Sequence, residues 1–189
     1  MAIRTIREEG DEILRKKSRE VETIDEKIVE LIHDMFDTMH KFNGVGLSAV
    51  QVGILKRIVV IDTGEDGERF ALINPEIIKA KGEQTVEEGC LSFPNKFGKI
   101  VRPNEVTVVA LNEKGEKVKL KAKELLAQAI CHEVDHLNGE LFIDKILPGS
   151  LEIVNPEDQK KWIEVEGMNI VFKHDAKDIW FHKGVIFWK

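Results

Sequence analysis

The sequence His132-Glu133-Val134-Asp135-His136 places two histidines four residues apart, with a carboxylate directly after the first. Residues four apart lie on the same face of an α-helix, so both imidazoles can reach one metal ion. A glutamate beside the first ligand is well placed to take a proton from a water molecule at that ion. The pattern therefore predicts a metal-binding helix with a general base. The alternative is an ordinary amphipathic helix with surface charges.

A catalytic site of the zinc type needs a third protein ligand and keeps a fourth position open for water. The run Glu88-Gly89-Cys90-Leu91-Ser92 contains Cys90, whose thiolate is a suitable ligand. A single cysteine is more often a small buried residue, so Cys90 taken alone does not establish a metal site.

A third stretch, Gly44-Val45-Gly46-Leu47-Ser48-Ala49-Val50-Gln51, combines glycines with a neutral amide. Its glycines allow a substrate backbone to approach closely. The side-chain amide of Gln51 is a suitable donor to an oxyanion. A glycine-rich loop of this kind is usually just a turn, and this one lacks the Gly-Lys-Ser/Thr ending of a phosphate-binding loop.

Composition indicates a globular protein of one main domain. The 189 residues are 42% hydrophobic and 33% charged, and no apolar run approaches the length of a membrane span. The start, Met1-Ala2-Ile3-Arg4, does not resemble a signal peptide, and two cysteines suit a reducing compartment. We therefore expect a cytoplasmic protein. The net charge of −6 argues against a general nucleic-acid binder.

The order of the periodic segments predicts an α+β fold. A capping-box pattern at 23–26 indicates an amphipathic helix to about Phe42, and a second helix should run from near Ala122 to Asn138-Gly139. We expect antiparallel β-sheets packed around the second, metal-binding helix, with the first as an N-terminal helix. The β-rich runs between them lie at 57–62, 70–73, 76–81, 85–88, 105–111 and 117–120.

The three stretches, in this order, resemble the three motifs of the peptide deformylase family. Those motifs read roughly G-x-G-L-A-A-x-Q, E-G-C-L-S and Q-H-E-x-D-H-L-x-G, and they correspond to residues 44–51, 88–92 and 131–139. Ser48 and Cys131 depart from the usual Ala and Gln. The resemblance covers about residues 3 to 150. It implies a catalytic domain at 1–150, followed by an extension at 151–189.

The resemblance implies that the protein is a metal-dependent hydrolase. Its reaction would remove the formyl group from the N-terminal N-formylmethionine of newly made polypeptides and release formate. The cofactor would be one divalent metal ion, Fe²⁺ in the cell, with Zn²⁺, Ni²⁺ or Co²⁺ as alternatives. The residues that it assigns are Cys90, His132 and His136 as metal ligands, Glu133 as general base, and the Gln51 side chain with the Leu91 backbone N–H as oxyanion donors.

By the same resemblance, the peptide backbone of the substrate would pair with Val45-Gly46 and with the segment around Glu88-Gly89. The methionine side chain would enter an apolar pocket, although its residues also suit an ordinary core. The implied partners are N-formylmethionyl nascent peptides and the ribosome exit region. We expect no sequence-specific nucleic-acid binding and no membrane association, and the sequence leaves monomer and dimer open. The pocket residues are Val45, Val86, Leu125 and Ala129.

The C-terminal segment differs from the basic C-terminal helix that contacts the ribosome in some bacterial deformylases. Residues 155–189 hold six acidic and six basic side chains, so they do not form a basic tail. We expect short strands at 162–165, 168–172 and 179–188, packed on the domain.

Two other functions fit part of the sequence. A zinc protease would take its third ligand from a His or Glu downstream of the helix, and such residues are present, for example Glu140 and His174. A binding module with a structural metal site would use four protein ligands and would have no need of Glu133 or Gln51. Cys90 upstream of the helix separates the deformylase assignment from the zinc protease, and Glu133 and Gln51 separate it from the binding module.

Overall fold

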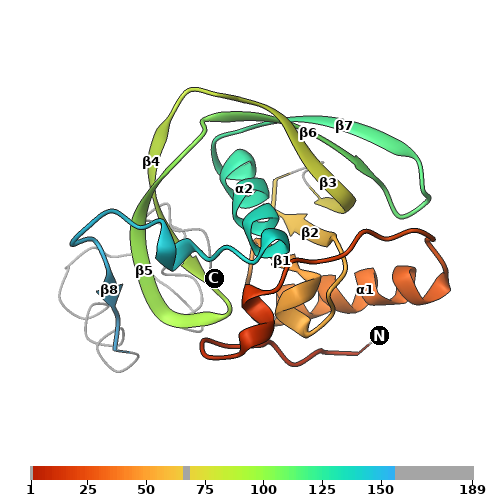
Figure 1. The fold of residues 1–189 in the computed structure, drawn as a ribbon, viewed down its shortest axis with the longest axis horizontal. Coiled ribbons are helices and arrows are strands. Elements are labelled where there is room, and N and C mark those ends of the chain that lie inside the picture. Colours follow the sequence, from red (N-terminus) through yellow and green to blue (C-terminus); the bar gives the residue numbers. More distant parts are fainter. Residues whose placement is uncertain (1, 66–68, 156–189) are drawn as a thin grey trace, which may run out of the picture.

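The computed structural model describes residues 2–65 and 69–155. Within them the chain forms two antiparallel β-sheets and two α-helices (Figure 1), which confirms the α+β class. The strands predicted at 162–165, 168–172 and 179–188 lie outside the described residues. None of the described helices is long and apolar enough to cross a membrane.

The elements follow a simple order along the chain, and every pairing between the named strands is antiparallel. The first sheet has the order β1-β2-β3-β6-β7 and the second the order β4-β5-β8. Short 3₁₀ helices occur in the described part of the chain at Glu12–Arg15, Ala49–Val52 and Phe142–Asp144. The main elements are α1 (Glu26–Lys41), β1 (Gly46–Ser48), β2 (Ile58–Asp62), β3 (Arg69–Lys81), β4 (Gln84–Cys90), β5 (Phe93–Arg102), β6 (Glu105–Leu111), β7 (Lys117–Lys123), α2 (Glu124–Asn138) and β8 (Glu152–Ile153).

Helix α1 begins one residue after Asp25, whose side chain accepts a hydrogen bond from the Ile28 backbone N–H at 3.0 Å. The cap is thus Asp25 rather than Thr23, because a carboxylate oxygen satisfies the exposed N–H groups of the first turn. Apolar residues at helical spacing, among them Met35 and Met39, are fully buried along one side of the helix.

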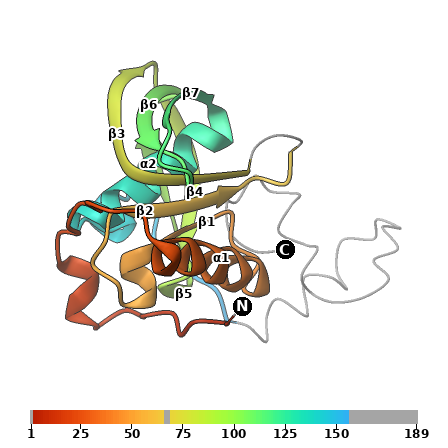
Figure 2. The same cartoon turned by 90° about the vertical axis from the view of Figure 1, so that its right-hand side faces the viewer.

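At β2 the five-stranded sheet is covered on both faces, as the side chains of this strand show. Ile58 and Val60 pack in the same core cluster as α1, whereas Val59 and Ile61 pack with α2. Successive side chains of a strand point to opposite faces, so one apolar strand supplies both cores. The two helices therefore lie on opposite sides of the sheet (Figure 2).

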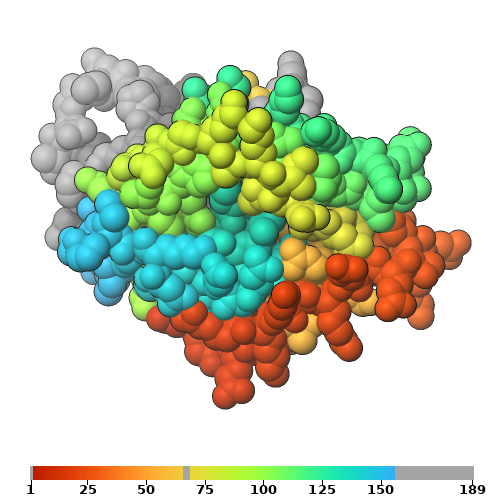
Figure 3. All heavy atoms as spheres, turned by 45° about the horizontal axis from the view of Figure 1, so that its top comes forward, coloured from red at the N-terminus to blue at the C-terminus, as the bar shows by residue number. Residues whose placement is uncertain are grey.

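Helix α2 lies between the two sheets (Figure 1). Ile130 and Ala127 pack on the five-stranded sheet, while Phe142, just beyond the helix, packs with Cys90 and Phe93 of the second sheet. In Figure 3, β3 and β4 (yellow to yellow-green) lie on one side of α2 and the loop after it, and the N-terminal segment (red) lies on the other. Helix α2 accordingly contacts β1, β2, β3, β6, β7 and the 3₁₀ helices at Glu12–Arg15 and Ala49–Val52.

Helix α2 ends at Gly139, which adopts a left-handed conformation with φ of +78°. A Cβ at this position would lie 2.4 Å from the Arg15 carbonyl oxygen. Glycine is therefore required here both by the backbone conformation and by the close approach of the N-terminal segment.

Candidate metal centre

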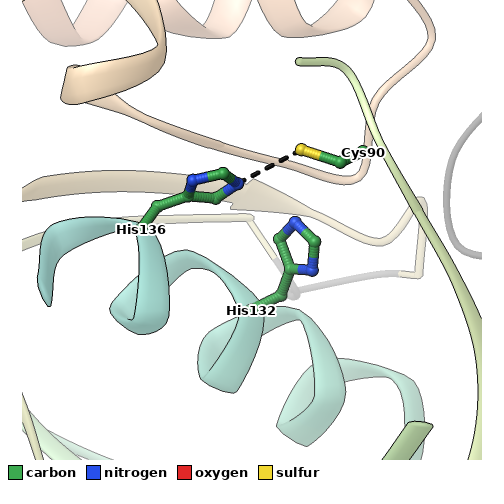
Figure 4. A group of neighbouring side chains, drawn as sticks. All are labelled: Cys90, His132 and His136. Atoms are coloured by element: carbon green, nitrogen blue, oxygen red, sulfur yellow. Dashed lines mark hydrogen bonds between the residues drawn. The ribbon is translucent and has the colours of Figure 1, made fainter. Parts of the chain in front are cut away.

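Cys90, His132 and His136 converge in the buried interior, and each is 1% exposed. One ligand atom from each lies within 4.8 Å of the others, and Cys90 Sγ lies 3.2 Å from His136 Nε2. Figure 4 shows both imidazoles rising from α2 toward the thiol at the end of β4. The structure thus brings together the three residues predicted as metal ligands, although His132 and His136 follow Cys90 by 42 and 46 positions in the sequence.

A register shift at the end of β4 presents Cys90 to the helix. Gly89 pairs with Phe97, but the next residue, Cys90, pairs with Phe93. This irregularity closes the β4–β5 turn tightly. A Cβ on Gly89 would lie 2.7 Å from the Phe97 ring, so only glycine allows this approach. Phe93 packs edge-on against Phe142 with ring centroids 5.6 Å apart, and this contact stabilises the turn.

A buried ionic network orients His132. Its Nδ1 lies 3.0 Å from Glu88 Oε2, so its Nε2 faces Cys90 and His136 (Figure 4). Arg102 binds Glu88 through two hydrogen bonds of 2.7 and 2.9 Å and donates a third, of 2.6 Å, to Asp135. A carboxylate behind a histidine ligand fixes its tautomer and its ring orientation. The side chain of Glu88 therefore faces the network, and only its backbone remains for the predicted substrate contact.

The network keeps its charges at neutral pH. Burial alone would raise the pKa of Glu88, but hydrogen bonds from Arg102 and His132 outweigh it and lower that pKa to about 2. Burial and the neighbouring His132 lower the pKa of His136, which favours the neutral imidazole that a metal ligand requires.

We expect the Arg102→Gln variant to unfold with a free energy about 3–5 kcal/mol lower than the wild type, because Glu88 would remain buried without its cation. Urea unfolding followed by circular dichroism measures this difference. The matched control is Lys96→Gln, which breaks a partly exposed pair with Glu9 and should cost less than about 1 kcal/mol. Equal losses in the two variants would contradict a special role for the buried network.

Glu133 lies next to the three ligands and is 1% exposed. Burial raises the pKa of its carboxyl group to about 7. Within the described residues its Oε2 has no hydrogen-bond partner. A Cβ on Gly46 would lie 2.6 Å from Glu133 Oε1, so the backbone of β1 packs directly on the carboxylate. A buried carboxyl group that titrates near neutrality is suited to proton transfer.

The amide of Gln51 is held in one orientation. Its Oε1 accepts hydrogen bonds from the backbone N–H and the hydroxyl of Ser48, at 2.8 and 2.9 Å. Its Nε2 donates toward Cys90 Sγ at 3.5 Å and Ser92 Oγ at 3.2 Å. The Nε2 hydrogens of Gln51 are therefore directed toward the region where the three predicted metal ligands meet. Leu91, also predicted for the site, lies buried in the turn directly after Cys90.

The residues predicted for the substrate pocket are brought together only in part. Val45 and Ala129 pack in one apolar cluster beside α2. Leu125 is 36% exposed, and within the described residues neither it nor Val86 belongs to a core cluster. Gly46 and Gly89 place their backbones beside Glu133 and Phe97.

Sequence reasoning gave no role to Asp135, Ser48 or Ser92, all of which contact site residues. Each of these residues lies inside one of the three motifs. The motifs thus located the residues in the sequence but did not predict which side chains they contact. These contacts depend on pairs of side chains from distant segments, which periodicity does not reveal.

The donor set fits a divalent transition metal. One thiolate and two imidazoles are ligands that zinc and ferrous iron accept. A set of three protein ligands would leave a fourth position for water, as in catalytic rather than structural zinc sites. The carboxylate of Glu88 behind His132 supplies the outer hydrogen bond that such ligands normally have.

Comparisons with known proteins agree with one another. The family model described as Polypeptide deformylase matches residues 3–152. The chain is 58% identical to peptide deformylase 1 of Clostridium acetobutylicum over 146 residues, 77% of this chain and 96% of that protein. It is similar to crystal structures of peptide deformylases from Legionella pneumophila (TM-score 0.75, 47% identity, 78% of this chain and 88% of that one) and Thermotoga maritima (TM-score 0.75, 42% identity, 78% and 100%). This chain therefore belongs to the polypeptide deformylase family.

Proposed function

We propose that the protein removes the formyl group from the N-terminal N-formylmethionine of newly made polypeptides and releases formate. The observation that carries this proposal is the buried triad of Cys90, His132 and His136 with Glu133 beside it, in a member of this family. The Cys ligand upstream of α2 also disfavours a zinc protease, whose third ligand would follow the helix.

Cys90, His132 and His136 would hold one divalent metal, which makes α2 the metal-binding helix at the centre of the fold. Fe²⁺ is the proposed ion in the cell, and Zn²⁺, Ni²⁺ or Co²⁺ suit the same donors. When bound, the ion acts as a Lewis acid that lowers the pKa of water toward neutrality. Proton transfer and stabilisation of the oxyanion would come from protein groups next to the metal site.

Glu133 would accept the proton of the attacking water and then deliver it to the departing α-amino group. Its burial supports this role, because a pKa of about 7 allows the carboxyl group both to take and to give a proton near neutral pH.

Gln51 and Leu91 would stabilise the oxyanion that forms as the formyl carbon becomes tetrahedral. The Gln51 Nε2 hydrogens are already directed at the site because Ser48 holds Oε1. The Leu91 backbone N–H, which directly follows Cys90 in the chain, is the second proposed donor. Such preorganised donors need no reorganisation during the reaction.

The substrate backbone would lie as an added strand between β1, at Val45 and Gly46, and β4, at Glu88 and Gly89. Support comes from the position of β1, which is an edge strand of its sheet and packs against Glu133. The methionine side chain would enter a pocket formed by Val45, Val86, Leu125 and Ala129.

We also infer that residues 1–150 form the catalytic domain and that an extension begins at 151, of which residues 156–189 lie outside the described residues. The pairing of β8 with Lys96 and Phe97 of β5 supports this for the first residues of the extension. Because the substrate is a newly made chain, the proposed place of action is the ribosome exit region in the cytoplasm.

The test is formate release from formyl-Met-Ala-Ser by protein prepared without oxygen. We expect turnover of this peptide and no cleavage of casein. Casein cleavage without formate release would instead support a protease. Neither activity in a folded, metal-replete protein would support a non-catalytic metal-binding module.

A further inference from the structure

Six lysines lie on one face of the five-stranded sheet, at its β3–β6–β7 end. Strand β7 alternates Lys117, Lys119, Lys121 and Lys123 with smaller or apolar residues, and all four lysines are exposed. The residues between them face the other way, and Ala122 packs in the cluster that contains α2. We call the side that carries the lysines the lysine face.

Strand β3 adds two lysines to the lysine face. Through β6, Lys79 aligns with Lys121 and Lys81 aligns with Lys123. Paired residues in an antiparallel sheet point to the same side, and neighbouring strands lie about 4.8 Å apart. The lysine face is therefore a two-dimensional array of cations, defined by Lys79, Lys81, Lys117, Lys119, Lys121 and Lys123.

The lysine face is hollowed rather than flat. A groove of about 310 Å³ runs over it, lined by lysines of β3 and β7 and by Glu105 and Thr107 of β6. Strand β3 changes register between Ile77 and Lys79, and such irregularities bend a strand. Ile78, at this irregularity, is the large apolar side chain exposed at the groove.

The charges of the lysine face are mostly uncompensated. Only Glu76 and Glu105 align with it, and Lys123 is its one member in an ion pair within the described chain, 3.0 Å from Glu105. The hydrogen bond from Lys123, with the charges of Lys81 and Lys121, lowers the pKa of Glu105. This cationic surface occurs in a chain whose net charge is −6.

Lysines on an edge strand commonly prevent pairing between copies of a protein. That explanation suits β7, which is the edge of its sheet. It does not explain why Lys79 and Lys81 of β3 line the same groove, two strands away.

We propose that the lysine face binds the phosphodiester backbone of RNA. An extended array of lysines with no convergent buried anchor suits a polyanion rather than a small anion. Exposed Ile78 alone is too little apolar surface for membrane insertion, and the mostly charged lining of the groove suits a polyanion better than the apolar side chains of a peptide. The choice of RNA rests on the proposed function, because newly made polypeptides are presented on ribosomes.

The geometry allows this contact without blocking the metal centre. Val106 and Val108 of β6 point toward α2, whereas Thr107, between them, points to the lysine face. The two sites therefore lie on opposite faces of the same sheet. The contact would read no bases, which agrees with the expectation of no sequence-specific binding. It departs from the expectation, drawn from the net charge of −6, that the chain is not a general nucleic-acid binder, because the cations gather on one face.

The test uses a fluorescein-labelled single-stranded RNA of mixed sequence and measures its anisotropy with the full chain. If about four phosphates are neutralised, affinity should fall roughly 50-fold between 50 and 200 mM salt. The variant Lys79→Gln/Lys119→Gln/Lys121→Gln should bind about tenfold or more weakly at 50 mM salt. The control, Lys16→Gln/Lys17→Gln/Lys27→Gln, makes the same charge change at exposed residues elsewhere and should stay within about twofold of the wild type.

Three results would overturn the proposal: no RNA binding by the wild type at 50 mM salt, equal weakening in both variants, or binding to phosphatidylserine vesicles through these lysines in place of RNA. Both variants should release formate from formyl-Met-Ala-Ser at the wild-type rate and elute as the wild type does in size-exclusion chromatography. Failure of the wild type to release formate would count against the proposed function alone, since the anisotropy result judges the lysine face separately.

Discussion

Replacing Glu133 with Gln should lower the kcat of formate release by about 10²–10⁴-fold. An amide has nearly the same shape as the carboxylate, so it should still fit against the backbone of Gly46. It cannot accept the proton of the attacking water or pass it to the leaving amine. The measurement is steady-state formate release from formyl-Met-Ala-Ser, together with the metal content of each preparation.

The matched control for this variant is Glu140→Gln, which removes a carboxylate just beyond α2 that pairs with Lys145 at the surface. That change should leave kcat within about twofold of the wild type, because a surface ion pair contributes little. If Glu133→Gln retains full activity with its metal bound, proton transfer by Glu133 is ruled out.

Replacing Gln51 with Leu should lower kcat by about 10²–10³-fold and change KM little, because the amide acts on charge that develops in the transition state. The rigid orientation of the amide in the structure is the reason to expect an effect of this size. Ser48 supplies two donors to Oε1, so Nε2 stays directed at the site before substrate binds.

The control for Gln51 is Gln84→Leu, at the opposite end of β4 from Cys90, where the amide donates to the Pro103 and Glu124 carbonyl oxygens. It removes an amide of the same size with no contact to the metal ligands, and kcat should stay near the wild-type value. A rise in KM with an unchanged kcat in Gln51→Leu would instead indicate that Gln51 binds the ground state.

Local rules of sequence were enough to find the elements that hold the site. The spacing of His132 and His136 places both on one helix face, and Gly139 ends that helix as a left-handed cap. The continuous apolar run Ile58-Val59-Val60-Ile61 indicated a strand, and the run is continuous because β2 has apolar neighbours on both faces. These features depend on neighbours in sequence, which is why periodicity and capping patterns detect them.

Strands with irregular pairing, β3 and β5, could not be predicted from the pattern of neighbouring residues. The separate strands expected at 70–73 and 76–81 are one strand, β3, which continues through Asn74 at a φ of +52° and a register shift. Strand β5 was not predicted at all, because Pro94, Asn95 and Gly98 interrupt its apolar pattern. Strand β5 forms because it pairs with β4, the strand that ends at Cys90.

The contacts of the candidate site show the same limit. The motif carrying Cys90 was recognisable, but its place beside His136 depends on the closing turn at Phe93. A pair between Glu88 and Arg102 was one interpretation of the sequence, with a solvated pair as the alternative, and the structure shows the buried pair. The link from Arg102 to Asp135 of α2 was not foreseen. Pairings of side chains over such separations follow from the packed fold.

The most direct test is to titrate metal-free protein with Fe²⁺ under anaerobic conditions while recording formate release from formyl-Met-Ala-Ser. We predict that turnover is absent at first, rises linearly with added metal and reaches a plateau at about one equivalent, as expected for a single three-ligand site. The Cys90→Ser variant should show a weaker, shallower rise, because a hydroxyl is a poorer ligand than a thiolate. Turnover by metal-free protein, or no turnover at any metal concentration, would contradict deformylase chemistry at Cys90, His132 and His136.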